Sequence, residues 1–342
     1  HQDYLTGMLL VAGITMFYTF FGGFMGASYT DMVQGLLMLA ALIAVPIVAI
    51  TNMGGLDHVT DAVANVRPDA LGLFAGTTFI GIASALAWGL GYFGQPHIIV
   101  RFMALRTPED AKAGRRIGMS WMLLTVVGSI STAFVGVAYF ATHPEVSLTD
   151  KESAETVFLD LAQILFHPFI AGMILAAVLA AIMSTLSSQL VVCSSALVED
   201  LYGVFVKKKL SSNQSLWLGR AGVAIVAVIA TLMALDKNNS ILSLVEFAWA
   251  GFGSAFGPIV ILSLYWRKLT LPGAVSGMVV GAVVTFFWRQ VFNLTETIEV
   301  YEMIPGFFLA FLVTVVVSLA TYQKNEEIEQ EFDKAAELAK AG

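Results

Sequence analysis

The stretch that decides the fold is Ala87-Trp88-Gly89-Leu90-Gly91-Tyr92-Phe93-Gly94-Gln95-Pro96-His97. It closes an apolar run from Leu71 that is long enough to cross a bilayer. Its three glycines and its proline disfavour a helix, since Gly and Pro cost about 1 and about 3 kcal/mol relative to Ala. Irregular backbone at membrane depth persists only where protein covers it or where it lines a cavity. We therefore predict that this stretch forms one wall of a transport site.

The composition of the whole chain indicates a membrane protein. The 342 residues are 57% hydrophobic and 13% charged, and the mean hydropathy is +0.79. A soluble domain carries about 25% charged residues. We predict an all-α polytopic membrane protein in contact with the lipid bilayer. No paired acid–base set, nucleophile or metal-binding motif stands at membrane depth, so we expect neither an enzyme nor a nucleic-acid partner.

Apolar segments of about 20 residues predict nine membrane spans. They lie at residues 5–24, 29–52, 71–100, 117–141, 168–200, 216–235, 241–265, 272–292 and 303–322. We expect residues 1–323 to form one transmembrane domain and 324–342 a short acidic tail. The polar segment 53–70 is expected to be an ordinary loop, and 154–166 an amphipathic surface helix.

Basic residues predict the orientation of these spans. If the spans alternate, fourteen of the 18 Lys and Arg residues lie on one side, which the positive-inside rule makes cytoplasmic. His1 is then outside and the acidic tail inside. No initiator methionine or signal peptide opens the chain, so we expect further spans upstream.

Asp31 lies at the mouth of the second predicted span. A carboxylate there costs several kcal/mol unless it is paired or hydrated. Asp also suits the N-cap of a helix. Both an N-cap and a role in an ion pathway are therefore open for this residue.

The fifth predicted span contains Ala181-Ile182-Met183-Ser184-Thr185-Leu186-Ser187-Ser188. On a helix, positions 181, 184, 185 and 188 share one face, so the hydroxyls of Ser184 and Thr185 should lie beside the carbonyl of Ala181. Three neutral oxygens close together suit a dehydrated monovalent cation. Membrane Ser and Thr also bond to preceding carbonyls or pack small against small, which is the structural alternative.

These motifs resemble the sodium/solute symporter family, and most closely its proline-transporting branch. The resemblance covers essentially the whole chain. It is strongest in Tyr18-Thr19-Phe20-Phe21-Gly22-Gly23-Phe24, in the stretch from Trp88 to His97 and in Met183-Ser184-Thr185-Leu186-Ser187. A further match is Ala248-Trp249-Ala250-Gly251-Phe252-Gly253.

The resemblance implies a leucine-transporter-like core of two inverted five-helix repeats, with substrate and ion held at interrupted helices. The first, third and fifth predicted spans look like core helices 4, 6 and 8. The N-terminal core helices 1–3 are then missing from this chain and are expected to precede His1.

The resemblance also implies the site residues. Trp88, Tyr92 and Pro96 look like substrate-binding residues, spaced i, i+4 and i+8 on what would be one helix face. Ala181 (through its carbonyl), Ser184 and Thr185 look like the ligands of Na+. Asp31 resembles an aspartate tied to sodium coupling.

The function implied is sodium-coupled import of L-proline by alternating access, in a bacterial plasma membrane. Glu246 and Phe247 depart from the Ser-Tyr pair that the resemblance implies at these positions, a difference that bears on the choice of solute. Alternatives are a symporter of the same fold for pantothenate, a sugar or a carboxylate, and a symporter-like membrane sensor domain.

Overall fold

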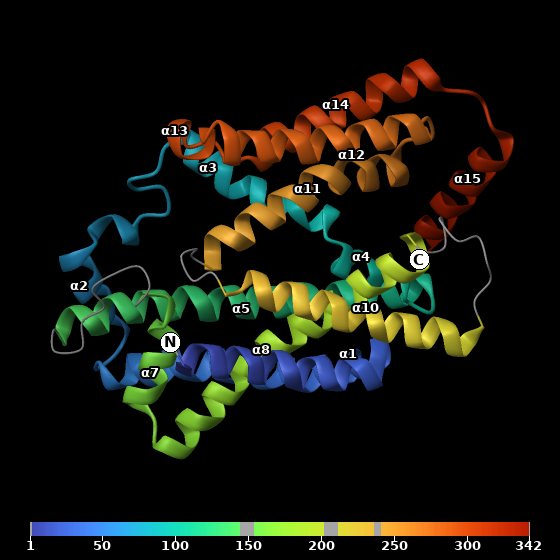
Figure 1. Ribbon diagram of the computed structural model, residues 1–342. Helices are drawn as coiled ribbons and strands as arrows, with labels where there is room; N and C mark the ends of the chain where they lie inside the picture. Colours follow the sequence, from blue (N-terminus) through green and yellow to red (C-terminus); the bar gives the residue numbers. More distant parts are fainter. Residues whose placement is uncertain (1, 144–153, 202–210, 236–240, 342) are drawn as a thin grey trace. The chain divides into compact units, whose positions relative to one another are not determined.

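The structure is a computed structural model that describes residues 2–143, 154–201, 211–235 and 241–341. The regular elements of its described part are all helices (Figure 1). The elements in chain order are α1 (Gln2–Asn52), α2 (Leu56–Val66), η1 (Pro68–Leu71), α3 (Phe79–Ala87), η2 (Trp88–Gly94), α4 (Pro96–Met103), α5 (Pro108–Thr142), α7 (Val157–Leu165), α8 (Pro168–Ser195), η4 (Ala196–Leu201), α10 (Ser212–Met233), α11 (Ile241–Tyr265), α12 (Leu271–Phe286), η5 (Phe287–Val291), α13 (Leu294–Ile298), α14 (Met303–Thr321) and α15 (Glu326–Ala341).

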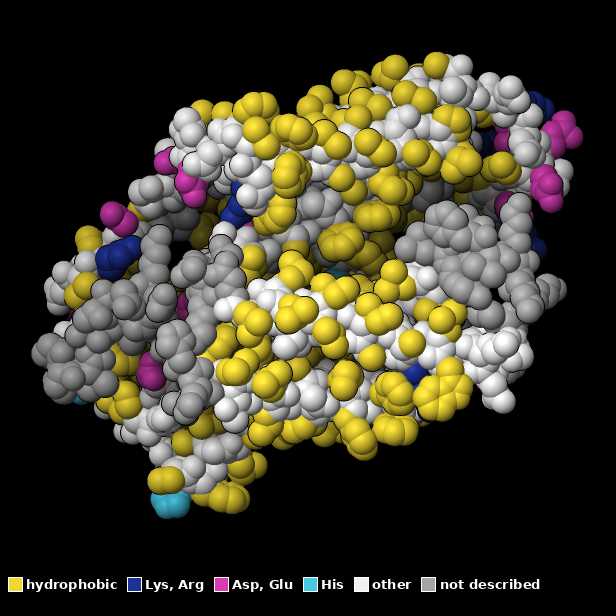
Figure 2. All heavy atoms as spheres, viewed as in Figure 1, with side chains coloured by type: hydrophobic (Ala, Val, Ile, Leu, Met, Phe, Trp, Pro, Cys, Tyr) yellow, Lys and Arg dark blue, Asp and Glu magenta, His cyan; other side chains and the backbone are white. Residues whose placement is uncertain are grey.

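Seven helices in this described part are long and apolar enough to cross a membrane. Counted with the two arms of α1 apart and with the interrupted segment 79–103 included, they match the nine predicted spans. Apolar side chains cover much of the face seen in Figure 2, and charged ones are few on it. Such a surface faces lipid in a multi-pass membrane protein.

The chain divides into two compact units, and each is described by itself. Unit 1 comprises His1–Ala75 and Ile117–Asn238, and unit 2 comprises Gly76–Arg116 and Asn239–Gly342. Unit 1 holds α1, α8 and α10 with most of α5. Unit 2 holds the interrupted segment together with α11, α12 and α14.

In unit 1, α1 is broken at Gly23, whose φ of 53° and ψ of −150° are not helical. Glycine adopts such angles without the strain that a side chain would add. The hydroxyl of Tyr4 reaches the carbonyl of Ala234, and the carbonyl of Phe20 accepts from Arg220, so the first arm runs against α10. The break lets the second arm return, as two spans of opposite direction require.

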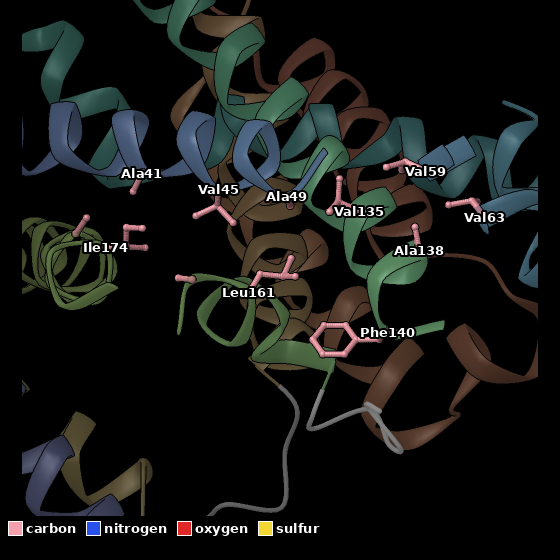
Figure 3. Close-up of a cluster of buried hydrophobic side chains, with 12 residues drawn as sticks. Ala41, Val45, Ala49, Val59, Val63, Val135, Ala138, Phe140, Leu161 and Ile174 are labelled. Carbon is pink, nitrogen blue, oxygen red and sulfur yellow. The ribbon is translucent and has the colours of Figure 1, made fainter. Parts of the chain in front are cut away.

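The core of unit 1 lies where the second arm of α1 meets four other helices (Figure 3). Val45 and Ala49 are fully buried there. The side chains that surround them come from α2, α5, α7 and α8: Val59, Val63, Val135, Ala138, Leu161, Ala162, Ile174 and Ala177. The expectation for 53–70 is therefore wrong in part, because α2 is a helix rather than a loop. α7 is the amphipathic helix expected within 154–166: it buries Leu161 and Ala162 in this core, while Gln163 and Ile164 are exposed.

In unit 2, the third predicted span is shorter than expected and is interrupted. Residues 72–78 are not helical, and α3 begins at Phe79 after Thr78, whose hydroxyl caps the amide of Gly81 at 3.0 Å. The backbone tightens into the 3-10 helix η2 from Trp88 to Gly94 and becomes extended at Gln95, before α4 starts. The glycine-rich stretch that disfavours a helix in the sequence is thus where the helix is interrupted, and the predicted start of the span at Leu71 is corrected to Phe79.

Small residues allow the long helices of unit 2 to pack closely. A Cβ at Gly277 would lie 1.8 Å from Oγ1 of Thr314, and one at Gly281 would lie 2.3 Å from the carbonyl oxygen of Ser254. These contacts join α12 to α14 and to α11. The glycines of these spans serve close helix packing, as small residues do in membrane bundles.

Candidate transport site

Unit 1 places the predicted sodium ligands on one turn of α8. The hydroxyl of Ser184 donates to the carbonyl of Ala181 at 2.8 Å, and that of Thr185 lies 3.3 Å from the same oxygen. Ser184 is half-buried, whereas Thr185 is exposed within the described residues. Three oxygens therefore converge, as the spacing predicts, and they can serve as ligands once the hydroxyl hydrogens turn away from the carbonyl.

Asp31 is tied to the next turn of the same helix. The hydroxyl of Ser188 lies 3.2 Å from Oδ2 of Asp31 and 2.9 Å from the carbonyl oxygen of Ser184, and can donate to either. Asp31 lies well inside the second arm of α1, which resumes directly after Gly23. It is not an N-cap, so that alternative is wrong.

Tyr18, which the sequence interpretation left without a role, joins this cluster from the first arm of α1. Its hydroxyl donates to the carbonyl of Met183 at 2.8 Å. It also lies beside Ser187, Thr15 and Gln34, close to the Asp31 carboxylate. Both arms of α1 and α8 thus enclose a patch of oxygen atoms inside an apolar unit. Tyr18 stands in one of the motifs of the family resemblance, and that was its only signal.

Unit 2 holds the predicted substrate residues, and here one geometric expectation is wrong. Trp88 and Tyr92 lie in η2, where three residues make a turn, so positions four apart point in different directions. Pro96 follows the extended residue Gln95 and begins α4. The three residues do not form a single helix face, because the glycines allow the tighter helix.

The side of this segment that carries Gly91, Gly94 and Gln95 packs on α11. A Cβ at Gly91 would lie 2.0 Å from Nε1 of Trp249, and one at Gly94 would lie 2.4 Å from the carbonyl oxygen of Phe252. Only glycine permits so close an approach. The buried side chain of Gln95 donates to the carbonyl of Trp249 at 3.2 Å. The interrupted backbone is thereby covered by protein on one side, as membrane depth requires.

Trp88 and Tyr92 are linked through Trp249. The rings of Trp88 and Trp249 are stacked, with centroids 5.8 Å apart, and Tyr92 meets Trp249 edge to face at 4.8 Å. Trp88 is half-buried, and Tyr92 is 38% exposed within the described residues. The structure thus joins two of the predicted substrate residues in one aromatic group, with Pro96 beyond the break.

Membrane-spanning helices, an interrupted helix with aromatic side chains and a hydroxyl-lined helix turn are together typical of secondary transporters. A sequence profile described as the sodium:solute symporter family matches residues 2–281. The chain belongs to the sodium:solute symporter family, a family of transporters rather than enzymes.

Curated relatives give the same result. The chain is 47% identical to the high-affinity proline transporter PutP of Bacillus subtilis (strain 168), over 97% of this chain and 69% of the relative. It is 44% identical to the sodium/proline symporter of Haemophilus influenzae, over 99% of this chain and 68% of the relative. The osmoregulated proline transporter OpuE of Bacillus subtilis is 49% identical, over 93% of this chain and 64% of the relative. The chain spans about two thirds of the length of these relatives.

A solved structure shows the fold. It is described as the substrate-bound outward-open state of a Na+-coupled sialic acid symporter that reveals a novel Na+ site. The TM-score is 0.75 at 18% identity, covering 94% of this chain and 68% of that one. The prediction of an all-helical membrane protein with a leucine-transporter-like core is confirmed.

Proposed function

We propose that the chain is part of a transporter that imports L-proline together with Na+ by alternating access. The relatives that support this proposal are proline transporters and sodium/proline symporters by name. The observation that carries it is the turn of α8 on which Ser184, Thr185 and the Ala181 carbonyl converge.

The chemistry of this turn suits a sodium ion. Sodium takes oxygen ligands, and a monovalent ion needs few formal charges around it, so hydroxyl and carbonyl oxygens are sufficient. In this proposal Ser184, Thr185 and Ala181 supply part of the coordination shell. The Asp31 carboxylate, 3.2 Å from Ser188 on the next turn, adds a negative charge that attracts a cation toward α8.

For the solute, the proposal assigns the aromatic residues of η2 and the proline that follows. Ring surface that suits the apolar ring of proline is offered by Tyr92, which is 38% exposed within the described residues, and by the part of Trp88 that its ring neighbours leave exposed. Pro96 bounds the segment at the start of α4. The interrupted backbone lies where amides and carbonyls freed from the helix pattern can bind a carboxylate and an amine.

Coupling follows from linkage between the two sites. If sodium favours the outward-facing state and that state binds proline more tightly, sodium raises proline affinity, and proline raises sodium affinity by the same factor. Inward opening into a sodium-poor cytoplasm releases both. In this proposal the protein lies in a bacterial plasma membrane, with the start of α1 outside and α15 inside. The basic residues gathered on one side of the predicted spans support this orientation.

Uptake by reconstituted vesicles tests the proposal. The natural full-length protein in proteoliposomes should accumulate labelled L-proline when an inward sodium gradient is imposed, and a potassium gradient should not replace it. A membrane-impermeant thiol reagent should label Lys112→Cys, in a Cys193→Ser background, only from the cytoplasmic side.

Competition separates the remaining alternatives. Excess unlabelled L-proline should abolish uptake, while pantothenate, sugars and carboxylates should leave it unchanged. Proline uptake that is the same with and without a sodium gradient would refute coupling of proline transport to sodium. Inhibition by one of the other solutes but not by proline would assign a different substrate to the same fold.

A further inference from the structure

Three aromatic rings from different elements form a stack in unit 2. Trp88 belongs to η2, Trp249 to α11, and Tyr301 precedes α14. The ring of Trp88 lies at an angle of 19° to that of Trp249 and of 12° to that of Tyr301, with centroids 5.8 and 6.0 Å away. Both neighbouring rings are thus nearly parallel to the indole of Trp88, which is one of the residues that bind the solute in the proposed function.

Trp249 contacts the 3-10 segment at several points. Its Nε1 donates to the carbonyl of Trp88 at 2.9 Å, its ring meets Tyr92 edge to face, and its own carbonyl accepts from Gln95. Gly91 faces the indole so closely that a Cβ would lie 2.0 Å from Nε1. The side chain of Trp249 therefore contacts the beginning and the middle of η2, and its backbone carbonyl holds Gln95, the residue that follows η2.

Tyr301 is itself held from two directions. Its amide donates to the hydroxyl of Ser84 on α3 at 3.1 Å, and its hydroxyl donates to the carbonyl of Glu246 on α11 at 2.8 Å. Burial, together with the charges of Glu302 and Glu246, raises the pKa of Tyr301. The hydroxyl therefore stays protonated at neutral pH and remains a donor.

The residue after Tyr301 is anchored by a buried ion pair. Glu302 is fully buried and accepts from Arg289 at 2.7 Å and from Thr295 at 2.8 Å. Arg289 also donates to the hydroxyl of Ser243 at 2.6 Å and lies 3.7 Å from the carboxylate of Glu246. This network joins η5, α11 and the segment before α14, so the backbone at Tyr301 has little freedom.

We propose that Trp249 and Tyr301 are positioning residues for solute binding: they hold Trp88 and the segment Trp88–Gly94 in the geometry that receives the solute, and the Arg289–Glu302 pair fixes Tyr301. The inference rests on the proposed function, in which Trp88 and Tyr92 contact the solute. Small displacements of groups that orient a ligand have large effects, which is why a rigid support matters.

The test uses the natural full-length protein in proteoliposomes with labelled L-proline. Trp249→Phe keeps a ring but removes the donor to Trp88, and should raise KM for proline about two- to tenfold, the range expected for one lost hydrogen bond. The half-saturating sodium concentration at saturating proline should stay within about twofold, because the coupling itself is untouched. Tyr301→Leu should raise KM at least as much, and Tyr301→Phe should raise it less than Tyr301→Leu, since the ring remains and only the bond to the Glu246 carbonyl is lost.

Two comparisons keep the result interpretable. Trp88→Phe is the reference variant for the solute site, and Trp266→Phe, just beyond α11, is the matched control that should change nothing. The stacked tryptophan pair should give an exciton signal in circular dichroism that Trp249→Phe abolishes and Trp266→Phe preserves. If Tyr301→Leu does not fold, the comparison of KM for proline between Trp249→Phe and Trp266→Phe decides whether the inference holds.

The outcomes distinguish the inference from the function on which it rests. The inference is overturned, and the function stands, if Trp88→Phe raises KM while Trp249→Phe and Tyr301→Leu do not. A loss of stability or of maximal rate without a change in KM also overturns it, because that result indicates a purely structural role. If Trp88→Phe itself leaves KM unchanged, the assigned solute residues are wrong and the inference falls with them.

Discussion

At the scale of single residues, the glycines of η2 determine how the interrupted helix is built. Gly91 and Gly94 face α11 so closely that any Cβ would overlap it, whereas Gly89 has open space around its Cβ position. The close contacts with Trp249 and Phe252 require glycine at positions 91 and 94, whereas the packing of η2 does not require glycine at position 89. The sequence shows all three alike, so only the structure separates their roles.

This difference predicts that alanine destabilises the protein at Gly94 and not at Gly89. Gly94→Ala places a methyl group 2.4 Å from the carbonyl oxygen of Phe252, which is backbone and cannot turn away. We expect Gly94→Ala to lower the free energy of unfolding by about 1–3 kcal/mol, as overpacking does. Gly89→Ala should change it by less than about 0.5 kcal/mol. Thermal unfolding in detergent micelles measures both, and equal losses would show that η2 does not pack on α11 as described.

At the scale of elements, hydrophobic length predicted the membrane helices well, since a span needs about 20 apolar residues. The pattern failed where backbone detail decides the result. The run from Leu71 looked continuous, but α3 starts only at Phe79, because Thr78 caps it and Gly76 before it has a φ of 69°. The i, i+4 spacing of Trp88 and Tyr92 suggested one face, but a 3-10 helix has another period.

Long-range partners were the other part that the sequence could not predict. The convergence of Ser184 and Thr185 on Ala181 followed from helical spacing alone and is confirmed. The bond between Ser188 and Asp31 joins residues 157 positions apart, and the stack of Trp88 on Tyr301 joins segments more than 200 positions apart. No local pattern encodes such pairs.

The ion pair before α14 gives a prediction at this scale. Removing one partner of a buried pair leaves an uncompensated charge and costs about 3–5 kcal/mol. Arg289→Ala should therefore strongly destabilise the protein, because the Glu302 side chain is fully buried. Arg267→Ala is the matched control, since its pair with Asp333 is about half exposed and such pairs contribute about 0–1 kcal/mol. Unfolding midpoints in micelles should fall far more for Arg289→Ala. Similar shifts for both would mean that the Glu302 pair is not a structural anchor.

At the scale of the whole molecule, the proposed sodium ligands and the proposed solute residues belong to different compact units. The proposed sodium ligands lie on α8 in unit 1, and the proposed solute residues lie on η2 and α4 in unit 2. A transporter couples its substrates when each ligand shifts the same conformational equilibrium. Both units therefore have to take part in one transition, and a ligand change in unit 1 should be detected as altered transport of the solute assigned to unit 2.

The measurement that tests this account most directly is a sodium titration of L-proline uptake by Thr185→Ala and Thr231→Ala. Both threonines bond to the carbonyl four residues earlier, Thr185 on α8 and Thr231 on α10 at 2.7 Å, so the two changes remove similar groups from similar helices. The account predicts that Thr185→Ala raises the half-saturating sodium concentration about tenfold or more, equivalent to about 1.4 kcal/mol, while Thr231→Ala leaves it unchanged. An unaltered sodium dependence in Thr185→Ala would contradict the assignment of the sodium site to α8.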